Sequence, residues 1–546
     1  MAASSVLSLS GLCHWAAWLF LLYLLYKAST LYLRWQQLRR VFSAFPGPER
    51  HWLYGNAHEL KEDGTDLDVM DGFAKQYEYG YPLWIGSFYA SLMVGHPEYA
   101  KAILTRQVLE ILDIIVGSLT IRGGDRTGGY IIVHQGLINA FGDPKDNVVY
   151  RFLVPWIGKG LLVLSGPKWF QHRKLLTPAF HYDVLKPYIK LMSDCTNTML
   201  DTWEKLVPDQ KPLELFHYVS LMTLDSIMKC AFSYESNCQN DSENEYIKAV
   251  YELSHLVEYR SRCYPYHNSL IFYLSPHGAR FRRALKIVHE HTSNVIKQRK
   301  EALKQVTELE KVKQRRHLDF LDILLYAKDE NGQGLSDEDL QAEVDTFMFE
   351  GHDTTASGVS WTLYCLAKHP EHQEKCREEI REVLGERNTV EWEDLGKMPY
   401  TTMCVKESMR LYPPVPVVAR ELSQPITFCD GRSLPKGTNV FLNIFSINRN
   451  PDMWEEPEVF DPLRFSPDNP IKKHAYSFIP FSAGSRNCIG QNFAMHEMKV
   501  AVALTLQRFE LTPDLDKDKE PLKAILVVLR SLNGIHVNLR KLQRKS

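Results

Sequence analysis

Cysteine pairs at metal-binding spacing are missing from this sequence, and so is any regular cysteine framework. Only 10 of its 546 residues are cysteine, and no two of them form a Cys-x-x-Cys pair. Small secreted domains held by disulfides carry dense and evenly spaced cysteines. A disulfide scaffold is therefore excluded, and we expect the body of the protein to occupy a reducing compartment.

Net charge is also nearly absent. Lysine and arginine together number 64, against 66 aspartate and glutamate residues, so the formal net charge is −2. Proteins that bind nucleic acid through bulk positive charge need a marked basic excess, and we therefore expect no nucleic-acid partner. The 45% of hydrophobic and 24% of charged residues are typical of a globular protein and exclude wholesale disorder.

Basic residues are absent from the N-terminus until Lys27, whereas residues 12–26 are uncharged and largely apolar. With the apolar residues up to position 33, this run approaches the ~20 residues that a membrane-spanning helix needs. A cleaved signal peptide, the alternative, would place basic residues before the apolar run. Here Arg34, Arg39 and Arg40 follow it, and the positive-inside rule favours an uncleaved anchor with the body in the cytosol.

The chain divides into three parts on this pattern. Residues 1–33 form the anchor helix, residues 34–50 form a basic linker with a Pro-Gly-Pro hinge, and residues 51–546 form the main domain. Helical periodicity dominates the main domain, and only short strand-like pieces interrupt it. We therefore predict a mainly α fold with small β-sheets.

The longest predicted helix begins at a Ser-x-x-Asp capping signal at Ser336 and runs to Lys368, because Pro370 ends it. At 1.5 Å per residue this rod is roughly 50 Å long, which is enough to cross a domain. Its apolar middle contains residues 350–355 (EGHDTT). Carboxylates and hydroxyls inside such a stretch indicate a functional role.

A cysteine near the C-terminus stands just before another predicted helix. Cys488 precedes residues 491–506, whose N-terminal N–H groups and dipole would stabilise its thiolate. Gly484 and Gly490 allow the backbone to pass close to a flat group, and Arg486 offers a cation to an acidic one. Because a lone buried cysteine is more often an inert core residue, Cys488 alone does not decide between the two interpretations.

The whole pattern around this cysteine resembles the haem-binding loop of the cytochrome P450 superfamily, F-x-x-G-x-R-x-C-x-G, matched at Phe481, Gly484, Arg486, Cys488 and Gly490. Three further motifs of that superfamily occur in the expected order: W-x-x-x-R at Trp169 and Arg173, E-x-x-R at Glu407 and Arg410, and P-x-R-F around Arg464. The resemblance extends from the anchor to about residue 539. It implies a fold in which haem lies between the long central helix and the Cys-ligand loop.

The resemblance also implies a role for each of these residues. Cys488 is the axial ligand of the iron of haem b, and its thiolate donates electron density that favours O–O cleavage. Asp353 and Thr354 deliver protons during oxygen activation, although a mid-helix threonine more often back-bonds to its own helix. The remaining roles are haem-propionate contacts for Arg173, Arg420 and Arg486, further haem contacts for Trp169, Phe481, Gly484 and Gly490, and a structural network of Glu407, Arg410 and Arg464.

A glutamate at position 350 narrows the resemblance from the whole superfamily to one of its families. In most of the superfamily a small residue stands here, whereas a glutamate resembles family 4, the fatty-acid ω-hydroxylases, in which it forms an ester to a haem methyl. Esterification would remove the cost of burying a charged carboxylate; the alternative is a protonated, hydrogen-bonded Glu350. Residues 169–180 and 317–325 also resemble family 4, especially the branch that acts on shorter chains and xenobiotics.

These resemblances imply a membrane-bound haem-thiolate monooxygenase that hydroxylates fatty acids or related lipophilic compounds at or near the terminal carbon. Electrons would come from NADPH through NADPH-cytochrome P450 reductase, with cytochrome b5 as a second candidate partner. The protein would lie in the endoplasmic reticulum membrane, in the microsomal fraction. The alternatives are a haem-thiolate isomerase or dehydratase of oxygenated lipids, and a haem-binding protein whose catalysis is impaired by an insertion.

That insertion is the one segment that departs from the family pattern. Residues 107–141 separate residues 99–106 from Gly142-Asp143-Pro144-Lys145, which should follow almost directly, and they add 35 residues. The segment is rich in isoleucine and glycine and has no helical period. We interpret it as translated intron or a mis-predicted exon boundary, with a genuine lineage-specific insertion as the alternative.

Overall fold

The structure, a computed structural model, describes residues 9–105, 142–209, 211–240, 244–304, 318–326, 328, 332, 334–470, 473–514 and 520–543. The segment 107–141 therefore lies outside the described residues. Within the described part of the chain, helices dominate and the strands form four small sheets. The predicted mainly α fold with small β-sheets is thus confirmed.

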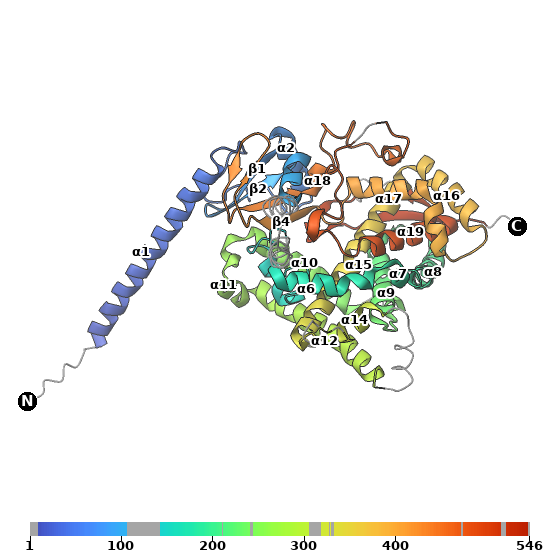
Figure 1. The fold of residues 1–546 in the computed structure, drawn as a ribbon, viewed down its shortest axis with the longest axis horizontal. Coiled ribbons are helices and arrows are strands. Elements are labelled where there is room, and N and C mark those ends of the chain that lie inside the picture. The colour runs from blue at the N-terminus through green and yellow to red at the C-terminus, as the bar shows by residue number, and fades with distance from the viewer. Residues whose placement is uncertain are drawn as a thin grey trace, which may run out of the picture.

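The described helices include a central one, α15, which crosses the body of the protein (Figure 1). They are α1 (Leu9–Phe42), α2 (Asp66–Gln76), α5 (Val154–Ile157), α6 (Gly166–Leu176), α7 (Tyr182–Leu185), α8 (Tyr188–Leu206), α9 (Leu215–Phe232), α10 (Glu245–Arg262), α11 (Ser269–Leu274), α12 (Pro276–Ala302), α14 (Phe320–Tyr326), α15 (Asp337–Lys368), α16 (Pro370–Leu384), α17 (Pro399–Leu411), α18 (Ile444–Ile447) and α19 (Gln491–Arg508).

The largest sheet lies near the end of the body that carries α1 (Figure 1). Its strand order is β1 (Gly80–Ile85), β2 (Tyr89–Val94), β7 (Asn439–Asn443) and β4 (Val417–Glu421), with β2 and β7 parallel and the other pairs antiparallel. A second sheet joins β3 (Leu213–Glu214), β11 (His536–Lys541) and β8 (Phe509–Pro513). The two remaining antiparallel pairs are β5 (Ile426–Thr427) with β6 (Ser433–Leu434), and β9 (Lys523–Leu526) with β10 (Val528–Ser531).

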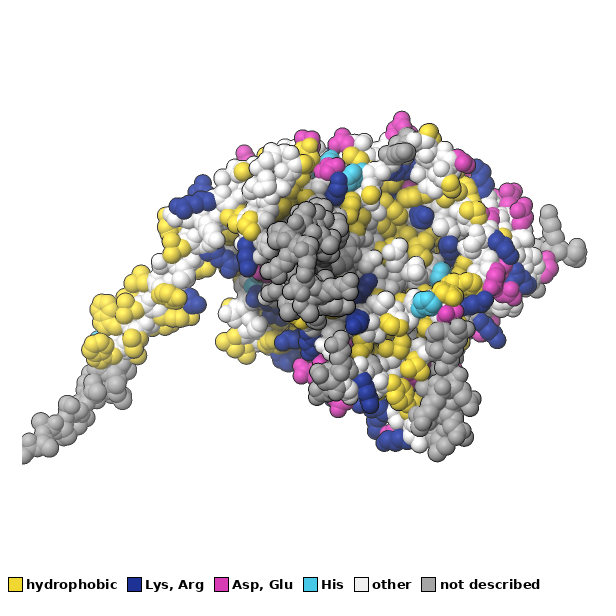
Figure 2. Space-filling model, viewed as in Figure 1, with side chains coloured by type: hydrophobic (Ala, Val, Ile, Leu, Met, Phe, Trp, Pro, Cys, Tyr) yellow, Lys and Arg dark blue, Asp and Glu magenta, His cyan; other side chains and the backbone are white. Residues whose placement is uncertain are grey.

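Helix α1 projects away from the body (Figure 1). Hydrophobic side chains cover much of its length, and basic side chains gather toward the body (Figure 2). Residues His14–Phe42 are long and apolar enough to cross a membrane, and the most apolar 18-residue stretch within them is not buried against the body. The helix continues past the expected end of the anchor and includes Arg34, Arg39 and Arg40.

The C-terminal end of α1 is packed into the body. Phe42, the last residue of the helix, is buried with its ring centre 6.2 Å from that of Trp84 in β1. Phe45, which precedes the Pro-Gly-Pro sequence, is also buried, 6.2 Å from Phe428. The end of the anchor helix and the residue before the Pro-Gly-Pro sequence are therefore both joined to the main domain by apolar contacts.

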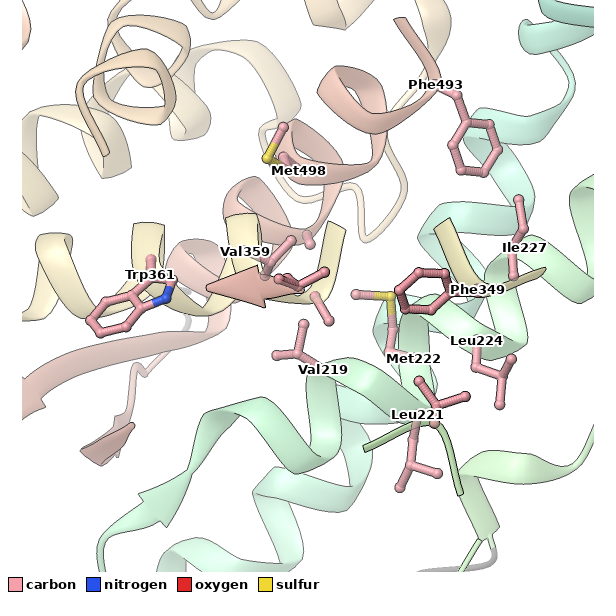
Figure 3. Close-up of a cluster of buried hydrophobic side chains, with 14 of the residues drawn as sticks. Val219, Leu221, Met222, Leu224, Ile227, Phe349, Val359, Trp361, Phe493 and Met498 are labelled. Carbon is pink, nitrogen blue, oxygen red and sulfur yellow. The ribbon is translucent and has the colours of Figure 1, made fainter. Parts of the chain in front are cut away.

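The central helix begins and ends where the sequence predicts. The Ser336 hydroxyl accepts a hydrogen bond from the Asp339 N–H at 3.0 Å, which caps α15, and the helix ends at Lys368 before Pro370. Its apolar side chains pack against α9 and α19, in a cluster that includes Leu224, Phe349 and others (Figure 3). This packing holds residues 350–355 at a fixed place in the interior.

A buried polar contact fixes α6 against α15. His172 Nδ1 lies 2.6 Å from Glu343 Oε1, and Glu343 Oε2 accepts a hydrogen bond from the Leu161 N–H at 3.1 Å. Both side chains are almost completely buried, so each needs the other as a polar partner. Because Trp169 and Arg173 share α6 with His172, this contact also sets the position of those two residues.

Replacement of a buried leucine at the α9–α15 contact should be costly. Leu224→Ala should lower the free energy of unfolding by about 2–5 kcal/mol, because the side chain is 0% exposed and its loss leaves a cavity. Urea unfolding of the purified full chain, followed by tryptophan fluorescence, measures the change. Leu270→Ala in α11 is the matched control, since that side chain is 70% exposed and should shift stability by less than about 0.5 kcal/mol. Equal losses in both variants would contradict this assignment of the core.

Candidate functional site

A cavity of about 370 Å³ lies between α15 and the loop that leads into α19. Its wall includes Glu350, Gly351, Thr354 and Thr355 from the middle of α15, and Cys488 on the opposing loop. Most of the other lining side chains are apolar, among them Leu83, Met93, Ile227, Phe349 and Val528. The residues that the sequence motifs single out therefore converge on one largely apolar chamber.

Cys488 opens directly into this cavity. Its side chain has free surface on the cavity side, although the surrounding protein keeps it far from bulk solvent. Burial raises the pKa of the thiol to about 11, so a thiolate at this place needs a compensating positive group. The Cys488 N–H donates to the Phe481 carbonyl at 3.0 Å, and α19 begins three residues later with Gly490 as its N-cap. The predicted position before a helix N-terminus is confirmed.

Gly484 and Gly490 of this loop differ in whether the structure has room for a side chain at that position. Gly484 has a φ of +75°, and a Cβ there would collide with the Leu104 carbonyl, so only glycine fits. A Cβ at Gly490 would meet only ordinary contacts, 3.8 Å from Phe180 and 3.9 Å from Cys488 Sγ. Gly490 lines the cavity beside the sulfur and leaves the space next to it free.

Helix α6 holds the cysteine loop from the side. Arg173 donates to the Asn487 carbonyl at 2.8 Å and to Asn487 Oδ1 at 3.0 Å, directly before Cys488. The Arg486 guanidinium carbon lies 4.5 Å from the centre of the Trp169 ring, a cation–π contact. Trp169 and Arg173 thus position the loop, and both also line the cavity.

Three buried cations meet at one edge of the cavity. Arg420 Nη2, Arg486 Nε and Arg486 Nη1 are buried without a hydrogen-bond partner among the described residues. Among the described residues, Lys145 Nζ hydrogen-bonds to the Tyr150 hydroxyl at 3.4 Å. Lys145 and Arg486 line the cavity, and in the described part of the chain no carboxylate forms an ion pair with any of the three.

The pKa shifts of these cations show how costly the cluster is. Burial lowers the pKa of Lys145 well below its ordinary value, and the positive charges of Arg420 and Arg486 lower it further. Burial and the charge of Arg420 likewise lower the pKa of Arg486 to about 9. A buried positive cluster without a carboxylate partner calls for an anion. These residues and the Cys488 thiol fit a haem, whose two carboxylates would meet the cations and whose iron would meet the sulfur.

Lys145 is the site residue that the sequence analysis missed. It follows the segment 107–141 directly, in Gly142-Asp143-Pro144-Lys145. Asp143 accepts from the Ser423 N–H at 2.8 Å, and the Pro144 carbonyl accepts from the Glu421 N–H at 2.9 Å. These contacts with the end of β4 bring Lys145 beside Arg420. The sequence around Lys145 contains no motif that would predict this contact.

The residues of α15 face two directions. Glu350 and Thr354 line the cavity, and the Thr354 hydroxyl donates to the Glu350 carbonyl at 2.7 Å, the back-bond that the sequence analysis named. Burial raises the pKa of Glu350 to about 7, against the opposing charge of Lys145. Asp353 is buried away from the cavity wall and forms an ion pair with Arg530 of β10. The expected acid–alcohol pair is therefore split, with only the alcohol at the cavity.

The expected network behind the cavity is assembled from α17 and the segment after α18. Glu407 and Arg410 form two hydrogen bonds of 2.8 Å, and both side chains are fully buried. Arg464 Nε lies 3.4 Å from Glu407 Oε1, and Arg410 also donates to the Pro457 carbonyl at 2.6 Å. Removal of one member would leave a buried charge without its partner. The three side chains hold the backbone that leads toward the cysteine loop.

Comparisons with known proteins show which family the sequence resembles over its length. The family model described as Cytochrome P450 matches residues 127–537. Cytochrome P450 4B1 of Rattus norvegicus is 50% identical over 539 residues, which cover 99% of this chain and 98% of that protein. Cytochrome P450 4A24 of Sus scrofa is 50% identical over 543 residues, or 99% of this chain and 100% of that protein. Cytochrome P450 4B1 of Homo sapiens is 49% identical over 536 residues, or 98% of each chain.

Loss of the Lys145 cation should weaken haem retention. Measured in a Glu350→Ala background, which lacks the carboxyl that could form an ester with the haem, Lys145→Met should speed haem transfer from the protein to apomyoglobin by about tenfold or more, since a hydrogen bond to a charged group is worth ~1.5–3 kcal/mol. The apoprotein should become no less stable, because the substitution removes a buried cation without a carboxylate partner. Lys159→Met, at an exposed position, is the control. An unchanged transfer rate in Lys145→Met would contradict a contact between Lys145 and the haem.

Proposed function

The chain belongs to the cytochrome P450 superfamily, in its family 4, and is a P450 monooxygenase; from this premise we propose that it hydroxylates fatty acids or related lipophilic compounds at or near the terminal carbon. Membership implies a haem iron cofactor, a reductase as redox partner and a lipophilic substrate. The observation that carries the finer proposal is the position of Glu350, which places a carboxyl on the wall of a largely apolar cavity.

Different residues of the chain have different proposed roles around the haem. When bound, the haem supplies the activation of dioxygen and the insertion of one oxygen atom into a C–H bond. Cys488 would ligate the iron as a thiolate, and Lys145, Arg173, Arg420 and Arg486 would hold the propionates by charge-assisted hydrogen bonds. The apolar wall excludes water from the substrate, and the Thr354 hydroxyl is placed at the cavity to hold a proton or a water.

We further propose that Glu350 is joined to a haem methyl by an ester. Burial raises the pKa of this carboxyl to about 7, so its charged form is costly there and an ester would remove that cost. The new C–O bond would replace a methyl C–H bond and the carboxyl O–H bond, with O2 and reductase electrons as the oxidant couple: haem-CH3 + RCOOH + O2 + 2 e− + 2 H+ → haem-CH2–OCOR + 2 H2O. The bond would fix the haem against α15 and make the space above it rigid. A rigid, narrow space favours approach of a terminal methyl group over the weaker C–H bonds of the neighbouring carbons.

Acid extraction tests the ester directly. Acidified organic solvent should leave haem in the protein fraction of the wild type and release all of it from Glu350→Ala, because haem without a covalent bond dissolves. Absorbance of the two phases near the Soret band measures the outcome. Thr354→Ala, which changes the same cavity wall but no carboxyl, should retain the haem as the wild type does. Complete release from the wild type would refute the ester.

We also propose that the protein lies in the endoplasmic reticulum membrane with its catalytic domain in the cytosol, and so fractionates with microsomes. Two apolar surfaces support contact with the bilayer beyond α1. Leu270 and Leu274 in α11 are 70% and 79% exposed, and Trp52 is 77% exposed. The loop of residues 52–54 adjoins the turn before α11, since Gly86 lies between Leu53 and Tyr264. These side chains would enter the bilayer beside the anchor.

The electron donor in this proposal is NADPH-cytochrome P450 reductase, with cytochrome b5 as a second candidate donor.

The segment 107–141 is proposed to be translated intron or a mis-predicted exon boundary. Residues on both sides of this segment belong to the site, because Leu104 contacts Gly484 of the cysteine loop and Lys145 lines the cavity. Extra residues between them would therefore disturb the site. Sequencing of the transcript decides this point: a message that contains these codons in most copies would refute it.

Product analysis tests the function. With reductase, NADPH and lauric acid, the protein should consume NADPH and form the terminal alcohol as a main product, which mass spectrometry identifies. The same assay on a chain without residues 107–141 should give higher activity and a larger reduced, CO-bound Soret band of the thiolate type. Conversion of an oxygenated lipid without reductase, and no hydroxylation of laurate by either chain, would favour an isomerase or dehydratase instead.

A further inference from the structure

Arg530 forms a buried ion pair that the proposed function leaves unused. Its Nη2 donates to Asp353 Oδ1, and the two residues are only 5% and 0% exposed. The guanidinium carbon lies 4.6 Å from the Phe216 ring and 5.1 Å from the Tyr251 ring, so aromatic faces cover the cation. A buried charge pair of this kind is costly unless its geometry is well defined.

We propose that Arg530 is a positioning residue for proton supply: it holds Asp353 beside Thr354 and links that carboxylate to the substrate-facing β9–β10 hairpin. The inference rests on the proposed monooxygenase function and deepens it. Asp353 itself does not line the cavity, whereas its neighbour Thr354 does. The role of Arg530 is therefore to fix the acid behind the wall, not to touch substrate.

The carboxylate keeps one oxygen available in this arrangement. Arg530 occupies Oδ1 of Asp353, while Oδ2 is buried with no hydrogen-bond partner among the described residues. His352 does not compete, because its Nδ1 lies 2.7 Å from the Met348 carbonyl in the preceding turn. An unpartnered carboxylate oxygen in the interior needs a donor, and a water would supply one, since the Thr354 hydroxyl already donates to the Glu350 carbonyl.

The hairpin that carries Arg530 also meets the substrate space. Ile525, Val527 and Val528 line the cavity around the turn between β9 and β10. Val527 has a φ of +63°, which is strained for a β-branched residue and marks a turn held by its surroundings. A substrate that fills the cavity would contact this turn, two or three residues from Arg530.

Two contacts attach this strand to α15 one helical turn apart. The Ser357 hydroxyl donates to the Leu529 carbonyl at 2.6 Å, and Arg530 binds Asp353 four residues earlier on the helix. A displacement of the hairpin tip therefore reaches Asp353 through a short, fully buried connection. Substrate occupancy and the orientation of the acid become coupled by this geometry.

The consequence lies in how the reduced oxygen is used. Productive turnover follows RH + O2 + 2 e− + 2 H+ → ROH + H2O, with the electrons supplied by the reductase. When the protons are misdirected, O2 + 2 e− + 2 H+ → H2O2 consumes the same electrons and leaves the substrate unchanged. The ratio of alcohol to peroxide per NADPH thus reports the positioning of the acid, whereas a purely structural role changes both products together.

The test compares Arg530→Met with the wild type in the reductase-coupled assay. The ratio of alcohol to peroxide should fall about tenfold or more, because a misplaced acid loses part of its contribution to proton transfer. The KM for laurate, the haem content and the reduced CO-bound spectrum should stay close to wild type. Lys523→Met, on the same hairpin but paired with Asp68 at the surface, should keep the wild-type ratio.

Further variants separate positioning from structure. Arg530→Lys, which keeps the charge, should recover part of the ratio, and Asp353→Asn should lose no more when combined with Arg530→Met than alone. If Arg530→Met loses its haem, the ratio in Asp353→Asn decides, and a wild-type value there overturns the proposal. An unchanged ratio in Arg530→Met also overturns it. A wild type that forms no alcohol from any lipid refutes the proposed function instead.

Discussion

Positive charge and a thiol buried around one cavity form the constraint on which the rest of the structure depends. Lys145, Arg420 and Arg486 come from three distant parts of the chain, and no carboxylate in the described part of the protein pairs with them. Each cation pays for desolvation, and Cys488 cannot ionise cheaply where it stands. A dianionic, metal-bearing cofactor offsets both costs at once. Folding of the haem-holding part and binding of the haem are therefore thermodynamically linked.

The surrounding helices keep this charged site in one shape. Arg173 binds Asn487 and so holds the backbone next to the cysteine, while Glu407, Arg410 and Arg464 hold the segment that approaches it from α18. These contacts use charged groups whose partners are backbone carbonyls or a single carboxylate. Such contacts have strict geometry, and they position the loop before the cofactor arrives.

The sequence predicted the family, the mainly α fold and the ends of the central helix, because capping at Ser336 and the break at Pro370 are local signals. The motif residues of the cysteine loop were likewise found by their spacing. Lys145 and the Arg530–Asp353 pair were not, since each depends on contacts between segments far apart in the chain. The direction of the Asp353 side chain depends on its tertiary contact with Arg530. Helical spacing alone did not show that Thr354 lines the cavity and Asp353 does not.

The way α1 joins the body has a consequence for the orientation of the whole molecule. Because Phe42 and Phe45 are both buried in the apolar interior, α1 and the body are held together by packing and not only by the chain between them. In the proposed membrane location, the tilt of α1 would therefore set the angle of the body above the bilayer. A lipid that leaves the acyl phase would then meet one fixed side of the protein, and a redox partner would meet its docking face at a constant height.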